Sequence, residues 1–508
     1  MNRKTGFLIV VKVLLGLFLW LVVGGCTRSA HTAPYINFSQ VNAPTLESGE
    51  TEPYPGPSPD PDRPDHTPTP DPPRPLPTLR SAEVVHTVRW GENLKSIARR
   101  YRVLPADIAH KNGIADPNLI YNGQQLEIPV PKVAETGPSH KLIPDSELVY
   151  GPYSADFQIA QNLQELGGYA ATYREEVDGR TYTGPQIIQR VAMEYSVNPR
   201  LLIALLEHQT GWATRPEGKN KNYPLKYKEA GYEGLYRQLA WAANQLNSGY
   251  YLWRVRGVGS WLCTDGINVP VDETINAGTA ALQHLFSFLQ PHSKWREVVS
   301  AEGFITTYRD LFGSPFAYTY EPLVPADLTQ PPLQLPFEQG VVWSFTGGPH
   351  GGWGSGSAWA AIDFAPPPGN LGCVQSKEWV VAAADGEIVY ANQGAVLQSI
   401  DGDPYPQTGW TLLYMHIASS QRVEVGTFLK AGERIGHPSC EGGVSTGTHL
   451  HLARRYNGEW IPADQNLPFN LEGWISRGDG APYQGSLVKN GRSIPAEGRK
   501  TDLNLIQR

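Results

Sequence analysis

The spacing of apolar residues changes twice along the chain. Between 84 and 131, alternating runs such as VVHTVRW and QQLEIPV enclose two short segments with helical spacing. From 150 to 313 apolar residues recur at helical intervals, and from 337 onward short alternating runs are separated by glycine turns. A period near 3.6 predicts helices and a period of two predicts strands. We therefore expect a multidomain protein with a small βααβ module, an α-helical middle domain and an all-β C-terminal domain.

Two proline-rich segments lie between these stretches. Residues 27–83 include EPYPGPSPDPDRPDHTPTPDPPRPLP, and residues 314–336 include YEPLVPADLTQPPLQLP. Proline fixes φ and has no N–H to donate, which excludes it from helix interiors and central strands. We expect the first segment to be a disordered, extended tether and the second to be a linker.

The N-terminus has the layout of an export signal. A basic start, MNRK, precedes an apolar run and then small residues before Cys26. The ending VVGGC resembles a bacterial lipobox, which implies a signal peptide over residues 1–26 and lipidation of Cys26. The alternative is a signal anchor that is not cleaved. Both interpretations place the following residues outside the cytoplasm, and the first predicts a lipid anchor in a bacterial membrane, facing the cell wall.

The net charge limits which partners the chain can bind, and the number of cysteines limits which disulfides it can form. The net charge is −7 and the pI is about 6.0, so we do not expect the basic surface of a nucleic-acid-binding protein. Cysteines outside the cytoplasm tend to pair. If Cys26 is lipidated, Cys373 and Cys440 flank one predicted domain and could form a bridge, which would leave Cys263 as a free, buried thiol.

The βααβ module resembles a known glycan-binding family. The stretch HTVRWGENLKSIARRYRVLPADIAHKNGIADPNLIYNGQQLEIP resembles a LysM module along its whole length, within residues 84–131. The resemblance implies binding to N-acetylglucosamine-containing glycans, chiefly peptidoglycan. The alternative is a module retained only for folding. By family analogy the ligand groove lies between the first strand–helix turn and the loop before the last strand, at Gly91, Glu92, Asn93, Leu94, Asn118 and Ile120.

The helical stretch over residues 150–313 weakly resembles the lysozyme-like fold of lytic transglycosylases. The segment NPRLLIALLEHQTGW would correspond to the helix that ends in a catalytic Glu-Ser pair, but this chain has Gln209-Thr210 there. Glutamine cannot donate a proton as a general acid. Either Glu207 has some other role, or the domain is a catalytically inactive relative that holds glycan, which is the interpretation we favour. The alternative is a helical spacer that packs between the other two domains. A glycan-cleaving domain is the alternative that Gln209 disfavours.

The C-terminal stretch gathers residues suited to a metal. Asp363 lies between Ile and Phe in WAAIDFAPP, where a carboxylate needs a partner. His449 and His451 are two apart in an expected strand, so their side chains share one face. Zinc accepts imidazole nitrogen and carboxylate oxygen, and catalytic sites use three protein ligands and leave one position for water.

Residues 337–465 resemble the lysostaphin-type zinc endopeptidases, and most closely their beta-lytic and staphylolytic branch. The motifs FTGGPHGGWGSGSAWAAIDF, LLYMHI and CEGGVSTGTHLHL carry the likeness. The commoner branch has its first histidine four residues before the aspartate, where this chain has Trp359; here the histidine lies 13 residues before it. The resemblance implies the zinc ligands His350, Asp363 and His451, and the non-ligand active-site histidines His416 and His449.

These expectations combine into one hypothesis. It is an exported cell-wall hydrolase with one Zn²⁺ per chain, which cuts peptide cross-links or stem peptides of peptidoglycan and is targeted to glycan by LysM. His449 is the candidate general base and His416 the candidate stabiliser or proton donor, and these roles are exchangeable. The alternative is a wall-bound lipoprotein that regulates other hydrolases without cutting. Residues 466–508 are expected to be a β-appendage without assigned chemistry, and His437 is taken as structural.

Overall fold

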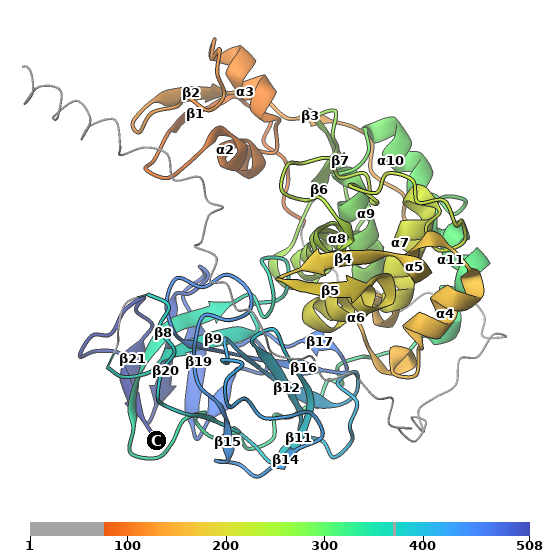
Figure 1. Ribbon diagram of the computed structural model, residues 1–508. Coiled ribbons are helices and arrows are strands. Elements are labelled where there is room, and N and C mark those ends of the chain that lie inside the picture. Colours follow the sequence, from red (N-terminus) through yellow and green to blue (C-terminus); the bar gives the residue numbers. More distant parts are fainter. Residues whose placement is uncertain (1–75, 369–371) are drawn as a thin grey trace, which may run out of the picture. The chain divides into compact units, whose positions relative to one another are not determined.

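The computed structural model describes residues 76–368 and 372–508 (Figure 1). The expected signal peptide, the lipidated Cys26 and most of the expected tether lie outside these residues. Within the described part of the chain, no helix has both the length and the apolar character needed to cross a membrane. The elements change from a small mixed unit through helices to strands in chain order, as the colours of Figure 1 show.

The first unit contains two helices between two antiparallel strands. Asn93 begins the first helix, since its side chain accepts a hydrogen bond from the Ser96 amide while the Ser96 hydroxyl accepts from the Asn93 amide. Leu94, Ile97 and Leu126 are among the residues of its own small core. The elements are β1 (Val84–Thr87), α2 (Leu94–Tyr101), α3 (Pro105–Lys111) and β2 (Gln125–Ile128).

The middle region is mainly helical. Helix α7 (Pro199–Thr210) begins at the Asn198 cap, ends at Gly211 with φ +73°, and is buried along most of its length. Helices α8 and α9 approach closely because Gly249 lacks a Cβ, which would lie 2.7 Å from the Ala281 Cα. The other helices are α4 (Ile159–Leu166), α5 (Tyr169–Thr172), α6 (Gly184–Tyr195), α8 (Leu235–Tyr251), α9 (Ala277–Ser287), α10 (His292–Val298) and α11 (Phe304–Phe312).

Short strands within this region depart from the all-helical expectation. They form a hairpin and a small sheet whose first strand comes from the connection after the LysM-like unit. Strands of two to four residues are too short to interrupt a helical period clearly, so the sequence pattern missed them. They are β4 (Arg174–Val177), β5 (Arg180–Thr183), β3 (Lys132–Val133), β6 (Ser260–Leu262) and β7 (Ile267–Pro270).

The C-terminal region is built on one antiparallel sheet. Its strand order is β14-β11-β12-β13-β16-β9-β8-β22, and β17 (Glu459–Trp460) pairs with β16. The strands are β14 (Phe428–Leu429), β11 (Gly386–Asn392), β12 (Ala395–Ser399), β13 (Trp410–Met415), β16 (Leu450–Tyr456), β9 (Ala361–Ala365), β8 (Val342–His350) and β22 (Leu505–Gln507). Strands β10 (Val380–Val381) and β15 (Arg434–Gly436) form a separate pair.

The last part of the chain is more than an appendage. Four of its strands form a second sheet that shares the apolar core of the main sheet, and the fifth, β22, is an edge strand of the main sheet itself. The four strands are β18 (Asn470–Leu471), β19 (Trp474–Gly478), β20 (Gly485–Lys489) and β21 (Arg492–Pro495).

The proline-rich stretch 314–336 is packed and is not a free linker. Leu323, Leu333 and Leu335 in this stretch are buried. Leu333 makes a parallel bridge to Leu471 of β18, and the guanidinium of Arg454 donates to the side-chain oxygen of Gln330. Proline excludes regular helix but does not prevent the apolar residues between prolines from being buried, which is why composition alone suggested a linker.

The middle region and the main sheet share an apolar core. Ala361, Leu413 and Ala453 of the sheet belong to the same buried cluster as the helical residues. Trp460 is fully buried there; its backbone N–H donates to the Tyr251 hydroxyl at 2.9 Å, and its indole N–H donates to the Tyr195 carbonyl at 3.2 Å. Burial of this kind makes the middle region a structural partner of the sheet.

Candidate metal centre

Three adjacent strands bring the predicted ligands together. His350 ends β8, Asp363 lies within β9, and His451 lies near the start of β16. The register places His451 directly opposite Asp363, and Gly347 of β8 opposite Asp363 on the other side. A Cβ at Gly347 would lie 2.5 Å from the Asp363 carboxylate, so glycine leaves the space that the aspartate occupies.

The three ligand atoms form a nearly equilateral triangle. His350 Nε2 lies 3.2 Å and His451 Nδ1 lies 3.3 Å from Asp363 Oδ1, and the two nitrogens lie 3.0 Å apart. All three residues are buried. Zinc binds such atoms at about 2.0–2.1 Å, so two ligands at the tetrahedral angle lie about 3.3 Å apart. The triangle therefore has the size of one face of a zinc tetrahedron.

Backbone carbonyls decide which nitrogens carry protons. His350 Nδ1 lies 2.8 Å from the Gly348 carbonyl, and His451 Nε2 lies 2.9 Å from the Gly352 carbonyl. A carbonyl can only accept, so these nitrogens donate and the opposite ring nitrogens of the neutral imidazoles present lone pairs. Asp363 Oδ1 finds no hydrogen-bond partner among the described residues. Three lone pairs that face one another in a buried site fit a cation.

Burial and mutual charge set the protonation states. Burial would raise the pKa of Asp363, but the neighbouring imidazoles, chiefly His350, hold that pKa well below its ordinary value. Burial lowers the pKa of His451, and lowers that of His416 to about 3. Burial also disfavours the charged form of His350, but the Asp363 carboxylate outweighs this and raises the pKa of His350. An ionised aspartate beside the neutral His451 suits metal binding.

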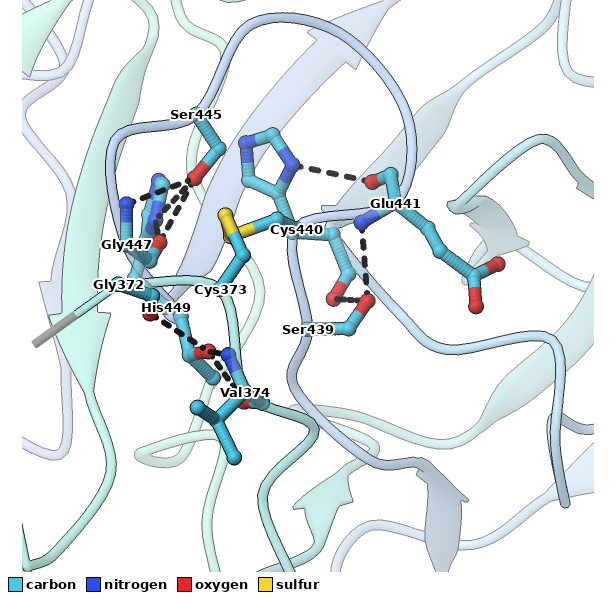
Figure 2. Close-up of a disulfide and its surroundings, with 11 residues drawn as sticks. Gly372, Cys373, Val374, Ser439, Cys440, Glu441, Ser445, Gly447 and His449 are labelled. Carbon is cyan, nitrogen blue, oxygen red and sulfur yellow. Dashed lines mark hydrogen bonds between the residues drawn. A yellow bond between two sulfur atoms is a disulfide. The ribbon is translucent and has the colours of Figure 1, made fainter. Parts of the chain in front are cut away.

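The two predicted non-ligand histidines lie beside this triangle. The ring centroids of His416 and His449 are 4.4 Å apart, and His449 Nε2 is 3.8 Å from Asp363 Oδ1. The Nδ1 of His416 bonds the Glu441 carbonyl. The Nδ1 of His449 bonds the Gly447 carbonyl, and both His449 and Gly447 are labelled in Figure 2. The Nε2 atoms of the neutral imidazoles thereby keep lone pairs that can accept a proton, and an Nε2 that has taken one up can donate it to a reacting oxygen.

Two further aromatic side chains, those of His437 and Tyr483, do not belong to the set of predicted ligands and catalytic histidines. His437 bonds the Glu378 carbonyl and the Gln421 side chain, away from the ligand atoms. Tyr483, in the expected appendage, stacks on His350 with centroids 4.1 Å apart, and its backbone N–H donates to the Pro349 carbonyl. Tyr483 is not among the residues predicted from the sequence, because a contact between residues so far apart in the chain leaves no local signal.

The residues predicted to bind glycan have mixed surroundings. Leu94 is buried, Asn93 caps α2, and Glu92 pairs with His86 and Arg100. Nearby exposed apolar side chains were not singled out from the sequence, although their residue types were visible. They are Trp90, which is 90% exposed, together with Leu119 and Tyr121.

Glu207 of the middle region has a structural role. Its carboxylate accepts hydrogen bonds from the backbone N–H groups of Ala213 and Thr214, each at 3.0 Å, and from the Thr214 hydroxyl at 2.7 Å. These contacts hold the turn after α7. The neighbouring Gln209 is buried. The arrangement gives no support to acid catalysis by Glu207.

Family models match three parts of the chain. Residues 86–129 match the LysM domain, residues 141–326 match the LasA N-terminal domain, and residues 358–462 match Peptidase family M23. The chain carries a LysM domain and an M23 peptidase domain. Asp363 and His451 lie inside the M23 match, and His350 lies just before it. M23 peptidases are zinc metallopeptidases, and His350, Asp363 and His451 supply a fitting site for the ion.

Individual relatives agree with the predicted branch. Protease LasA of Pseudomonas aeruginosa (strain UCBPP-PA14) is 27% identical over 286 residues, covering 53% of this chain and 65% of that protein. Beta-lytic metalloendopeptidase of Achromobacter lyticus is 28% identical over 174 residues, covering 32% of this chain and 43% of that protein. The chain thus spans less than two thirds of these relatives. The solved structure titled "A Novel M23 Metalloprotease Pseudoalterin from Deep-sea" is 24% identical, covers 34% of this chain and 99% of its own, and has a TM-score of 0.28.

The middle region matches a family model other than the one that its sequence weakly resembled. The matching model is the LasA N-terminal domain, so the weak resemblance to lytic transglycosylases gains no support from the comparisons.

Proposed function

We propose that this protein is an extracytoplasmic zinc endopeptidase that cuts peptide cross-links or stem peptides of peptidoglycan. The observation that carries the proposal is the buried triangle of His350 Nε2, Asp363 Oδ1 and His451 Nδ1, with two further imidazoles beside it. The LysM domain holds the enzyme on glycan, and Cys26 or an uncleaved anchor attaches it to the membrane. The complete ligand set favours this function over regulation without cutting.

The chain's own residues have separate tasks in the reaction. Zinc, when bound, polarises a peptide carbonyl and lowers the pKa of water to about 7. His449 accepts the proton of the attacking water through Nε2, which lies on the side of Asp363. His416, once it has taken up a proton on Nε2, stabilises the developing oxyanion or delivers that proton to the leaving amine, and the two histidines can exchange roles. The glycine-rich segments GGPHGGWGSGS and EGGVSTG form the walls for a narrow peptide.

Removal of the metal tests the enzymatic claim. Purified residues 76–508 are expected to carry about one zinc ion per chain and to release new amino termini from peptidoglycan. A chelator should abolish this release, and added zinc should restore it. Mass spectrometry of the fragments identifies the bond. A zinc-loaded protein that binds peptidoglycan and releases no amino termini would contradict the proposal and favour the regulatory alternative.

The LysM domain should bind glycan through its exposed aromatic side chains. Trp90 adjoins the Gly91 turn, and Tyr121 follows Ile120 in the second predicted loop. Replacing Trp90 with alanine is expected to weaken binding to purified peptidoglycan about tenfold, since loss of one stacking contact costs about 1.4 kcal/mol. Co-sedimentation measures this. Val85→Ala, at another exposed position of the domain, is the control and should bind normally; equal binding by all three proteins would refute the assignment.

A further inference from the structure

A disulfide joins two segments beside the metal centre. Cys373 and Cys440 are bonded although 67 residues separate them, and their Cα atoms lie 5.4 Å apart (Figure 2). A second attachment lies at the other end of the same loop, at Thr448. The Thr448 backbone N–H donates to the Gly372 carbonyl at 3.1 Å, and its hydroxyl accepts from the Val374 N–H at 3.0 Å. Residues 440–448 are therefore fastened at both ends to residues 372–374.

This loop supplies the acceptors for both non-ligand histidines. His416 Nδ1 lies 3.0 Å from the Glu441 carbonyl, directly after Cys440, and His449 Nδ1 lies 2.8 Å from the Gly447 carbonyl, directly before Thr448. The carbonyl that accepts from each histidine therefore belongs to a residue next to one of the two attached residues, Cys440 or Thr448. Carbonyl oxygens can only accept. A correctly placed loop therefore keeps the proton of each neutral ring on Nδ1 and leaves each Nε2 with a lone pair.

The interior of the loop does not hold itself in place by apolar packing. Val444 is 97% exposed, and Gly442 and Gly443 have φ of +73° and +63°. The Glu441 side chain adds one more anchor, because its carboxylate accepts from the Ser419 backbone N–H at 2.9 Å and from the Ser419 hydroxyl at 3.2 Å. Ser419 follows His416 closely in the chain, so Glu441 holds this histidine through both its backbone and its side chain.

We propose that the Cys373–Cys440 disulfide and Glu441 are positioning elements that set the tautomer and ring orientation of His416 and His449. They act through the loop and touch neither substrate nor metal ligands. The effect on catalysis rests on the proposed function, whereas the effect on the tautomers does not. Loss of the disulfide leaves Gly447 and Glu441 on a loop with one attachment fewer, so each imidazole loses its fixed acceptor and samples both tautomers.

The test uses the zinc-loaded protein with ¹⁵N-labelled histidine. In the wild type, NMR is expected to show His416 and His449 protonated on Nδ1. In the Cys373→Ser/Cys440→Ser double variant, one or both should show mixed or exchanging tautomers, with zinc content unchanged. Positioned acid–base groups contribute about 10²–10⁴-fold, so partial loss of position should lower kcat about 10- to 100-fold with little change in KM. Cys263→Ser, a cysteine outside this region, is the matched control.

Glu441 provides a second route if the double variant does not fold. Glu441→Ala keeps the disulfide and should disturb the His416 tautomer, whereas Glu441→Gln keeps an acceptor for Ser419 and should restore it. Wild-type tautomers in the double variant and in Glu441→Ala would overturn the proposal, as would loss of zinc in parallel with loss of kcat. If the wild type shows the expected tautomers but cuts no peptide, the positioning stands and the proposed function fails.

Discussion

Replacing His451 with alanine is expected to abolish zinc binding and peptide hydrolysis together. The variant keeps only His350 Nε2 and Asp363 Oδ1 of the ligand triangle, and catalytic zinc sites require three protein ligands. Lewis-acid catalysis contributes several kcal/mol, and each 1.36 kcal/mol is tenfold in rate, so activity should fall by at least about 10³-fold. Metal analysis and release of amino termini from peptidoglycan measure the two losses in one preparation.

A histidine outside the cluster provides the control for this variant. His437 is buried and hydrogen-bonded but does not belong to the ligand set. His437→Ala should therefore retain zinc and most of the activity. Zinc retained at the wild-type level in the His451 variant would contradict the assigned site, and activity retained without zinc would contradict the proposed mechanism.

Replacing Trp460 with alanine is expected to destabilise the middle region and the sheet together. The side chain is fully buried in the core that the two share, and its indole N–H donates to the Tyr195 carbonyl of α6. Truncation of a buried tryptophan leaves a cavity and costs about 3–5 kcal/mol. The guanidinium of Arg455 lies 4.3 Å from the centre of its ring, so the variant also removes a cation–π contact.

Calorimetry or denaturant unfolding of residues 76–508 measures this loss. If the shared core couples the two regions, their unfolding should remain one transition at a lower midpoint. Trp90→Ala removes the same side chain from a position that is 90% exposed, and it should change stability by less than about 0.5 kcal/mol. A Trp460 variant with unaltered stability of the middle region would show that the two regions fold separately.

The shared core shows that the middle region packs against the main sheet and supports it. From the sequence, the middle region could be a glycan-holding domain or a spacer. An apolar helical period shows that one face of a helix is buried, but it does not show which element covers that face. In the structure, Arg254 of this region pairs with Glu459 of β17 at 2.9 Å, and the Ser196 hydroxyl donates to the Gly458 carbonyl at 2.6 Å. These contacts support the turn that leads from β16, the strand of His451, into β17.

The sequence by itself determined the modules and the ligand types. The LysM and M23 segments carry their information in local motifs, and residue type limits which side chains can bind zinc or move a proton. The i, i+2 spacing of His449 and His451 also follows from strand geometry, because alternate residues share a face.

Only the tertiary structure decided the ring tautomers, the contact of Tyr483 with His350 and the packing of residues 314–336. Each depends on a pairing between residues far apart in the chain, such as the Gly352 carbonyl with His451 Nε2. Hydrophobic period and motif spacing specify which element a residue occupies. They do not specify which carbonyl, ring or cysteine of another element it will meet, because that is set by register and packing across the whole core.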